Sequence, residues 1–335
     1  MRHTIFPVLV CIAAICLFSS CSSPVGKDKT SKSSYKKNNP NEEYVLVTTA
    51  VSLPLYVRHD EAAFERWGKQ TGVKTSILGP SDWNVPAQIS TIEQVIGSQP
   101  AGLLINGTDP AIAEVINKAV DAGIPTVVYD SDIPGSKRDA FLGSDWYEIG
   151  KLQGQELVKL TGGKGKVACL GILGMTNQEA GFRGLQDVLK QYPDIQFIGK
   201  YDARNMETAA TVASNLIRAN PDLAALAAFT SETGPGIALA VREAHKKGEI
   251  KITGVDWEPQ LLNLVKEGII QFLVGQKREL FTWYGAQFLY DLAHHTNALT
   301  LNDKKAGVSA VPNIVNTGLL KINASNVDLF INKKN

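Results

Sequence analysis

Cysteine is scarce in this chain of 335 residues, which has four in all, and three of them fall within the first 21 residues, at Cys11, Cys16 and Cys21. Only Cys169 remains in the rest of the chain, inside an apolar stretch. Neither a disulfide framework nor a thiolate metal site can be built from one cysteine. We expect Cys169 to be a buried strand residue rather than a reactive thiol.

Neither sign of charge is in excess, since 34 basic residues stand against 33 acidic ones. A balanced surface produces no field that would attract a polyanion, so the sequence predicts no binding of nucleic acid. Histidine is sparse as well, with five in all. The pair His294-His295 falls on a predicted helix, where neighbours point to different faces, and we therefore expect no metal site.

Glycine is missing from residues 48–54, the turn after the first predicted strand. A dinucleotide fold needs glycine there, so that the pyrophosphate can approach the backbone at the start of a helix. The glycine-rich run 162–166 comes after a predicted helix and before a strand, which is typical of a turn. We expect no nucleotide or other cofactor.

The one long apolar run, residues 5–18, is too short for a membrane span of about 20 residues and follows the basic residue Arg2, which predicts an export signal. The sequence Leu17-Phe18-Ser19-Ser20-Cys21 is similar to a bacterial lipobox. We expect residues 1–20 to be a lipoprotein signal peptide, Cys21 to carry the lipid and residues 21–43 to be a flexible, polar tether. A plain signal peptide cleaved nearby is the alternative. Either predicts a protein exported to the periplasm or cell surface, and a lipidated Cys21 would be its only contact with the membrane.

From residue 44 onward short apolar runs alternate with longer amphipathic segments, which is typical of strand-helix-strand units and a parallel sheet. Strands are predicted at 44–49, 73–78, 101–106 and 126–130, with intervening helices such as 87–96 and 111–122. After residue 145 the alternation restarts, with strands at 167–173, 196–201, 224–229, 251–255 and 271–275. A helix at 280–295 and a strand-like tail at 316–322 follow.

The chain is too long for one domain, and no linker rich in Pro or Gly separates its halves. The predicted fold class is therefore α/β, with two doubly wound parallel-sheet lobes joined by short crossovers. We assign residues 44–144 and about 277–311 to an N-terminal lobe, and residues 145–276 and about 312–335 to a C-terminal lobe.

In open parallel sheets a ligand lies beyond the carboxyl ends of the strands. Nearly every predicted strand here ends in a hydrogen-bonding group or an aromatic ring. The candidate ligand-binding residues chosen on this ground are Thr49, Tyr56, Asn106, Asp130, Ser144, Trp146, Glu179, Arg204, Ser231, Asp256, Trp257 and Gln276.

Several motifs at these strand ends resemble those of the ribose/xylose-type sugar-binding proteins of bacterial ABC transporters, over most of the chain from about residue 45 to 276. They are Leu-Leu-Ile-Asn-Gly-Thr-Asp-Pro at 103–110, Ala-Gly-Ile-Pro-Thr-Val-Val-Tyr-Asp at 122–130, Leu-Gly-Ser-Asp at 142–145, Thr-Gly-Val-Asp at 253–256 and Val-Gly-Gln at 274–276. The resemblance implies a periplasmic binding protein type I fold with a three-segment hinge, and a monomer that delivers its ligand to a membrane permease.

The resemblance also implies ligand contacts for eight of the candidates, which are Thr49, Tyr56, Asn106, Asp130, Ser144, Ser231, Asp256 and Gln276. Their chemistry agrees, because ionised carboxylates only accept hydrogen bonds and can take neighbouring hydroxyls, while amides both donate and accept. The aromatic candidates offer flat apolar faces, with core packing as the alternative. For Asp130 and Asp256 the alternative is a helix N-cap.

The chain departs from the family pattern at positions where relatives carry an arginine. Ser131 follows Asp130, and Glu179 and Gly181 stand where a second arginine is expected, while Arg204 stands near an expected aromatic. These departures predict an acidic pocket. One hypothesis is a ligand with an amine, held by Glu179 or Glu232.

Two other functions stay open at this point. A glycosidase could use two of the strand-end carboxylates, although the many amide and hydroxyl partners favour a binding protein over an enzyme. A sensor could present its bound ligand to a chemoreceptor or sensor kinase instead of a permease.

Overall fold

The computed structural model describes residues 42–331. The predicted signal peptide, the lipidation site Cys21 and all but the end of the expected tether lie outside the described residues.

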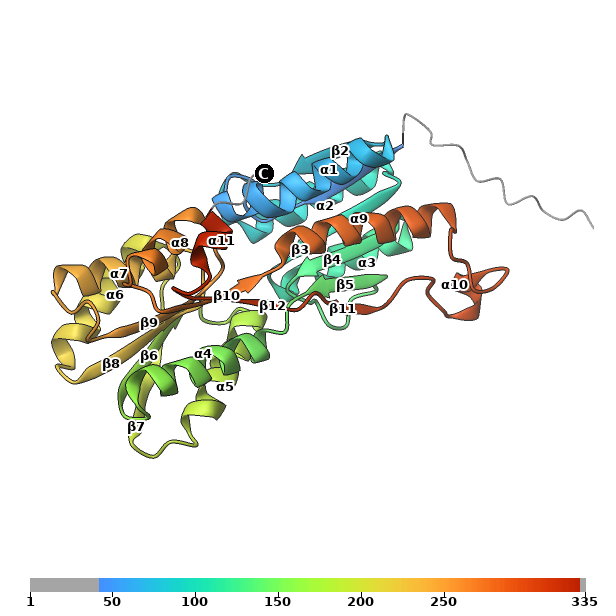
Figure 1. Cartoon of the computed structure of the whole chain (residues 1–335). Coiled ribbons are helices and arrows are strands. Elements are labelled where there is room, and N and C mark those ends of the chain that lie inside the picture. The colour runs from blue at the N-terminus through green and yellow to red at the C-terminus, as the bar shows by residue number, and fades with distance from the viewer. Residues whose placement is uncertain (1–41, 332–335) are drawn as a thin grey trace, which may run out of the picture. The chain divides into compact units, whose positions relative to one another are not determined.

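Two six-stranded sheets form the framework of the described chain (Figure 1). The strands of the first are β1 Glu43–Val47, β2 Lys74–Leu78, β3 Gly102–Gly107, β4 Thr126–Asp130, β5 Ala140–Gly143 and β11 Ile314–Asn316. Those of the second are β6 Gly165–Gly171, β7 Ile195–Asp202, β8 Leu223–Ala228, β9 Lys251–Val255, β10 Phe272–Gln276 and β12 Leu319–Ile322. The orders are β11-β5-β4-β3-β1-β2 and β12-β10-β9-β8-β6-β7, and every pair is parallel except β10 with β12. The predicted fold class is confirmed.

Helices cover both faces of the first sheet, and its strands are therefore apolar on both sides. Val45 and Val47 of β1 pack into the core beneath two of these helices, α2 Val85–Ser98 and α3 Ala113–Asp121. Tyr44 and Leu46 point to the other face, toward α1 Ala62–Thr71 and α9 Arg278–His294. The remaining helical pieces of this lobe are η1 Tyr56–Glu61, η2 Pro110–Ile112 and α10 Asp303–Ala306.

The second sheet is covered in the same way. The helices α4 Trp146–Thr161 and α5 Thr176–Leu189 pack on one face. The other face carries α6 Met206–Ala219, α7 Thr233–Glu243, α8 Pro259–Lys266 and α11 Val327–Ile331. Cys169 is a fully buried residue of β6, as predicted, and burial raises the pKa of its thiol.

The chain passes from one sheet to the other three times, after β5, after β10 and between β11 and β12. The tail predicted as one strand at 316–322 is two short strands, one in each sheet, because Gly318 between them turns the backbone at φ 76°. This last crossing lies a few residues beyond the expected boundary near residue 312. Strand β5, which sequence reasoning did not anticipate, precedes the first crossing.

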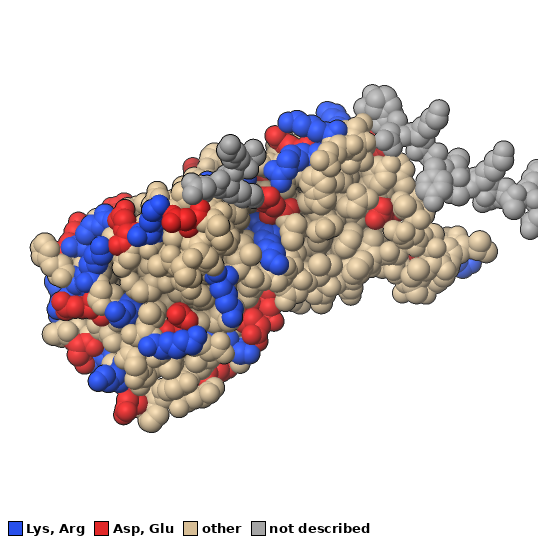
Figure 2. All heavy atoms as spheres, viewed as in Figure 1, with Lys and Arg blue, Asp and Glu red and all other residues tan. Residues whose placement is uncertain are grey.

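The surface agrees with the balanced charge of the sequence. Figure 2 shows basic and acidic side chains interspersed over the visible face of the second lobe, and fewer charges on that of the first. Within residues 42–331, none of the helices has the length and hydropathy needed to cross a membrane.

Candidate functional site

The carboxyl ends of the strands of both sheets line one pocket of about 520 Å³. The first lobe contributes the segments that follow β1 and β2, the last residue of β4 and the first residue of α9. The second lobe contributes the segments after β6, β7, β8 and β9, the last residue of β10 and the first residue of α4. This is the position expected for a ligand on doubly wound sheets.

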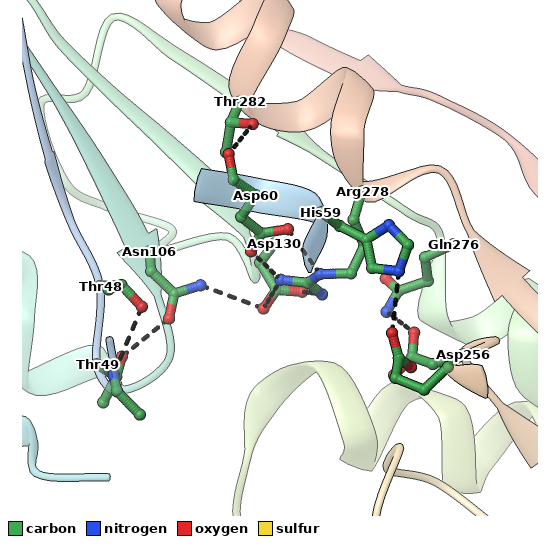
Figure 3. Close-up of polar contacts among 12 residues, drawn as sticks. Thr48, Thr49, His59, Asp60, Asn106, Asp130, Asp256, Gln276, Arg278 and Thr282 are labelled. Carbon is green, nitrogen blue, oxygen red and sulfur yellow. Dashed lines mark hydrogen bonds and ion pairs between the residues drawn. The ribbon is translucent and has the colours of Figure 1, made fainter. Parts of the chain in front are cut away.

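Arg278, the first residue of α9, lies between two carboxylates of the first lobe (Figure 3). Its Nε and Nη2 donate to Asp60 Oδ1 and Oδ2 at 2.9 and 2.7 Å, and its Nη1 and Nη2 donate to Asp130 Oδ1 and Oδ2 at 3.0 and 3.1 Å. The exposed fractions of the three side chains are 2% for Arg278, 0% for Asp60 and 8% for Asp130. Two negative charges therefore share one positive charge out of contact with water.

The pKa values in this cluster follow from burial and charge. Burial raises the pKa of Asp60 to about 6, although the guanidinium of Arg278 acts in the opposite direction. Burial disfavours the charged form of Arg278, but Asp130 and Asp60 outweigh it and raise the pKa of the guanidinium above its usual value. Thr282 of α9 also donates to the backbone oxygen of Asp60 at 2.7 Å, which ties η1 to α9.

Asn106, near the end of the neighbouring strand β3, binds the Asp130 carboxylate without itself lining the pocket. The hydroxyl of Thr49 donates to Asn106 Oδ1 at 2.9 Å, so the amide nitrogen of Asn106 faces Asp130 and donates to its Oδ2 at 3.2 Å. Gln88 donates to the backbone oxygen of Asn106 at 2.8 Å. This buried chain of hydrogen bonds sets the orientation of the Asp130 carboxylate.

Asp256 occupies the corresponding place in the second lobe, directly after β9. Gln276 Nε2 donates to its Oδ1 at 3.1 Å, and Trp257 Nε1 donates to the backbone oxygen of Gln276 at 3.0 Å. Burial, followed by the charge of Glu258, raises the pKa of Asp256 to about 7. An ionised Asp256 carboxylate would therefore be stabilised by further hydrogen-bond donors.

The two aspartates share an unusual backbone conformation. The φ angle is 76° at Asp130 and 72° at Asp256, in the left-handed region that few residues other than glycine adopt. Such conformations cost of order 1–3 kcal/mol and collect at functional sites. Neither aspartate is a helix N-cap, since no helix follows Asp130 directly and the N-cap position of α8 is Glu258. The N-cap interpretation of the sequence is therefore wrong for both.

Two buried polar atoms of pocket-lining residues have no hydrogen-bond partner within residues 42–331: Trp146 Nε1 and Gln276 Oε1. An indole nitrogen can only donate and an amide oxygen can only accept. Leaving such atoms unsatisfied costs about 1–3 kcal/mol each. A ligand that both accepts and donates hydrogen bonds would remove this cost.

The structure brings seven of the candidate residues together in the lining of the pocket: Tyr56, Asp130, Trp146, Arg204, Ser231, Asp256 and Gln276. The other five lie outside it, and two of these, Thr49 and Asn106, support Asp130 from behind. Trp257 packs its ring against His59 and Phe330, at centroid distances of 4.8 and 5.7 Å. Ser144 is buried at the first crossing between the sheets.

Glu179 is not brought to the pocket, contrary to expectation. It forms an ion pair with Lys200 of β7 and accepts a hydrogen bond from Gly174 N at 3.1 Å. Its charge is satisfied within its own lobe, so it is not available as a counter-charge for a ligand.

Sequence reasoning missed Arg278 and Asp60. The predicted helix began at residue 280, whereas α9 begins at Arg278, two residues after the strand-end residue Gln276. A basic residue so close to a strand end was the signal available. The predicted acidic pocket thus contains a buried guanidinium, that of Arg278, in addition to the predicted Arg204.

Residues 44–297 match the family described as periplasmic binding protein domain, which is well over half of the chain. The chain belongs to this family. The resemblance found in the sequence is thereby confirmed.

Individual proteins that are similar to this chain are consistent with the family match. The ribose import binding protein RbsB of Bacillus subtilis is 26% identical over 286 residues, which cover 84% of this chain and 92% of that protein. A solved sugar-binding protein of a sugar ABC transporter from Bacillus halodurans is 31% identical with a TM-score of 0.77, over 87% of this chain and 100% of that one. AraP, an arabinose binding protein from Geobacillus stearothermophilus, is 33% identical with a TM-score of 0.75, over 87% of this chain and 99% of that one. These relatives are binding proteins, which confirms the prediction that the chain is not an enzyme.

Proposed function

We propose that this protein is the substrate-binding component of an ABC-type importer and that it binds a sugar or polyol in the pocket lined by its two lobes. The observation that carries the proposal is the pair Asp130 and Asp256. Each lobe presents one buried carboxylate, on a left-handed backbone, to the same pocket. Carboxylates accept hydrogen bonds from hydroxyls, so a ligand with several hydroxyls can engage both lobes at once.

The other lining residues suit the same ligand. The Trp146 indole offers a donor, and the free amide oxygen of Gln276 offers an acceptor. The rings of Tyr56 and Trp146 supply apolar faces for the C–H groups of a sugar ring. The names of the relatives, which refer to ribose, arabinose and sugar, support this ligand class.

Binding is coupled to closure of the lobes about the three crossings between the sheets. Contacts from both lobes to one ligand stabilise the closed form, because they exist only when both lobes reach the ligand. Without ligand, the unsatisfied polar atoms of the pocket favour an open form in which water reaches them. The closed, loaded protein is the form that would be presented to a permease.

The protein is exported and acts in the periplasm or at the cell surface as a monomer. A lipid on Cys21 anchors it to the membrane, and residues 22–43 let the lobes move away from the bilayer. The match to the periplasmic binding protein family supports an exported protein, and the lipobox-like residues before Cys21 support the anchor.

Calorimetry with pentoses, hexoses and inositols tests the proposal. Wild-type protein should bind at least one of these compounds, and Asp256→Asn should weaken that affinity by at least about tenfold. Asp222→Asn is the matched control. Asp222 precedes the amino end of β8, so it lies away from the carboxyl ends that line the pocket, and it pairs with Lys166 at 2.9 Å. Equal affinity for wild type and Asp256→Asn, or a panel without any ligand and without compaction in solution scattering, would refute the proposal.

A further inference from the structure

The two lobes touch directly at His59. This residue belongs to η1 of the first lobe (Figure 3), and its Nε2 lies 2.9 Å from Oε1 of Glu258, which follows β9 in the second lobe. An ionised carboxylate only accepts hydrogen bonds, so Nε2 is the donor. The two side chains are 1% and 12% exposed, which largely excludes water from the contact. A buried hydrogen bond therefore joins the lobes through residues that are 199 positions apart.

The His59 ring also packs on the second lobe. Its centroid lies 4.8 Å from that of Trp257, the residue between Asp256 and Glu258. Trp257 Nε1 donates to the backbone oxygen of Gln276 at 3.0 Å, and the side chain of Gln276 donates to Asp256 at 3.1 Å. His59 thus contacts both residues that directly follow Asp256, and one of them binds the residue that holds the Asp256 carboxylate.

In the first lobe, His59 shares η1 with two residues of the site already described. The buried residues of this π-helix are Tyr56, which lines the pocket, His59 itself and Asp60, which binds Arg278. Such helical turns are rare and are frequent at functional sites. A displacement of η1 would therefore move the pocket wall and the His59 contact together.

The charged groups that act directly on His59 are acidic. Glu258 faces Nε2 from the second lobe, Oε1 of Glu279 in α9 lies 3.6 Å from Nδ1, and Asp60 is the next residue of η1. The nearest basic group in this chain of contacts is Arg66, which pairs with Glu279 at 3.1 Å. Burial disfavours the charged form of His59, but Glu258 and Glu279 outweigh it and raise the pKa of the imidazole. A protonated His59 therefore bridges one carboxylate from each lobe.

We infer that His59 is a positioning residue for ligand binding, which fastens the Asp256 side of the pocket to the first lobe when the lobes close. His59 does not line the pocket itself. Its contacts with Trp257 and Glu258 join the two lobes, so they stabilise the closed form and are lost as the lobes part. Ligand affinity includes the free energy of these contacts, because the ligand binds the closed form. This inference rests on the proposed function and adds to it a residue that acts from outside the pocket.

Calorimetry at pH 6 and pH 9 tests this role, with the pentose, hexose or inositol that the wild type binds most tightly. At pH 6 His59 is protonated, and His59→Gln should weaken the affinity about tenfold, because the charge and the ring contact are both lost. At pH 9 the wild-type imidazole is neutral, and the same substitution should weaken the affinity only about twofold. Each comparison is made at one pH, so that ionisation of Asp256 affects the wild type and the variant alike.

His294→Gln is the matched control. His294 Nε2 lies 2.8 Å from Glu42 Oε1, and the two side chains are 7% and 10% exposed, so the pair resembles that of His59 and Glu258 in distance and burial. Both residues of the control pair belong to the first lobe, and closure does not change their contact. The substitution should therefore leave the affinity unchanged at both pH values.

Glu258→Gln provides a second variant with a milder change, because glutamine still accepts a hydrogen bond from His59. The charge of Glu258 also acts on Asp256, so the substitution is made both in the wild type and in His59→Gln, and the difference between the two effects isolates the contact with His59. At pH 6 Glu258→Gln should weaken the affinity more in the wild type than in His59→Gln. Thermal unfolding shows that every variant is folded at the pH of the measurement.

The outcomes separate this inference from the proposed function. If the wild type binds a sugar and Asp256→Asn weakens that binding, but His59→Gln leaves it unchanged at pH 6, the positioning role fails and the proposed function stands. Equal losses for His59→Gln at the two pH values, equal effects of Glu258→Gln in the two backgrounds, or a loss of the same size for His294→Gln would also overturn the positioning role. If the wild type binds no compound of the panel, both proposals fail together.

Discussion

Replacement of Arg278 by methionine should be severe, because it removes the one positive charge between two buried carboxylates. All four hydrogen bonds from the guanidinium to Asp60 and Asp130 are lost. Removing one partner of a buried ion pair typically costs about 3–5 kcal/mol. We expect a loss of that size in the free energy of unfolding at pH 8.

Proton uptake limits this loss and makes it depend on pH. Asp60 can escape its unpaired charge by protonation, and because its pKa is about 6, this costs at most about 3 kcal/mol at pH 8. At pH 6 the same protonation costs almost nothing. The destabilisation by Arg278→Met should therefore be clearly smaller at pH 6 than at pH 8.

Urea unfolding followed by tryptophan fluorescence measures the effect. Arg278→Met should be partly rescued by Asp60→Asn, because the double variant buries one carboxylate without a partner instead of two. Arg66→Met is the control for the loss of an arginine, since Arg66 forms a half-exposed ion pair with Glu279 at 3.1 Å, worth about 1 kcal/mol or less. A double variant as unstable as Arg278→Met, or equal losses at the two pH values, would refute the reasoning.

Three further predictions concern the rest of the chain. The folded-state pKa of Asp256 is about 7 against an ordinary 3.8, so between these pH values the folded form binds more protons than the unfolded form. The free energy of unfolding therefore falls by up to about 4 kcal/mol as pH rises through this range. Asp256→Asn should remove this fall and unfold at a higher temperature than wild type at pH 8, and equal pH dependence of stability in wild type and variant would contradict the prediction. His59 Nε2 donates to Glu258 Oε1 of the second lobe at 2.9 Å, and although burial disfavours the charged form of His59, the carboxylates of Glu258 and Glu279 raise its pKa. The stabilisation from protonated His59 is full below its ordinary pKa and is lost as pH rises through the folded value, so His59→Gln should cost more free energy of unfolding at pH 6 than at pH 9, and equal costs would contradict this. Finally, Cys21→Ala should release the exported protein from the membrane fraction, as followed by fractionation and mass spectrometry, and a variant that stays in the membrane would exclude lipidation at Cys21.

The layered fold could be predicted because buried parallel strands are apolar on both faces. Residues 44–47 alternate between the two cores of the first lobe, yet all are apolar, and such runs recur along the chain. Strands β5 and β11 escaped prediction because they have four and three residues, too few for a recognisable pattern. Their place is determined by pairing with each other and with β4, which is a contact between distant segments.

The candidate site could be predicted to the level of strand ends. Asp130, Asp256 and Gln276 were found in this way, since in parallel sheets the residues after the strands meet at one edge. Strand ends do not reveal how far each side chain reaches. Asn106 was placed in the pocket by the same rule, but it supports Asp130 from behind, because the left-handed backbone at Asp130 places this carboxylate between Asn106 and Arg278.

The sequence by itself therefore determined the class of fold, the family and the edge of the sheets at which a ligand would lie, because these depend on local apolar patterns and on motifs of consecutive residues. Only the tertiary structure decided the charges of the pocket. Glu179 is neutralised by Lys200 of a neighbouring strand, and Arg278 returns to Asp60 from more than two hundred residues away. Whether a buried charge is paired depends on which distant segments the fold brings within about 4 Å of each other. The order of residues within one segment does not predict such a contact.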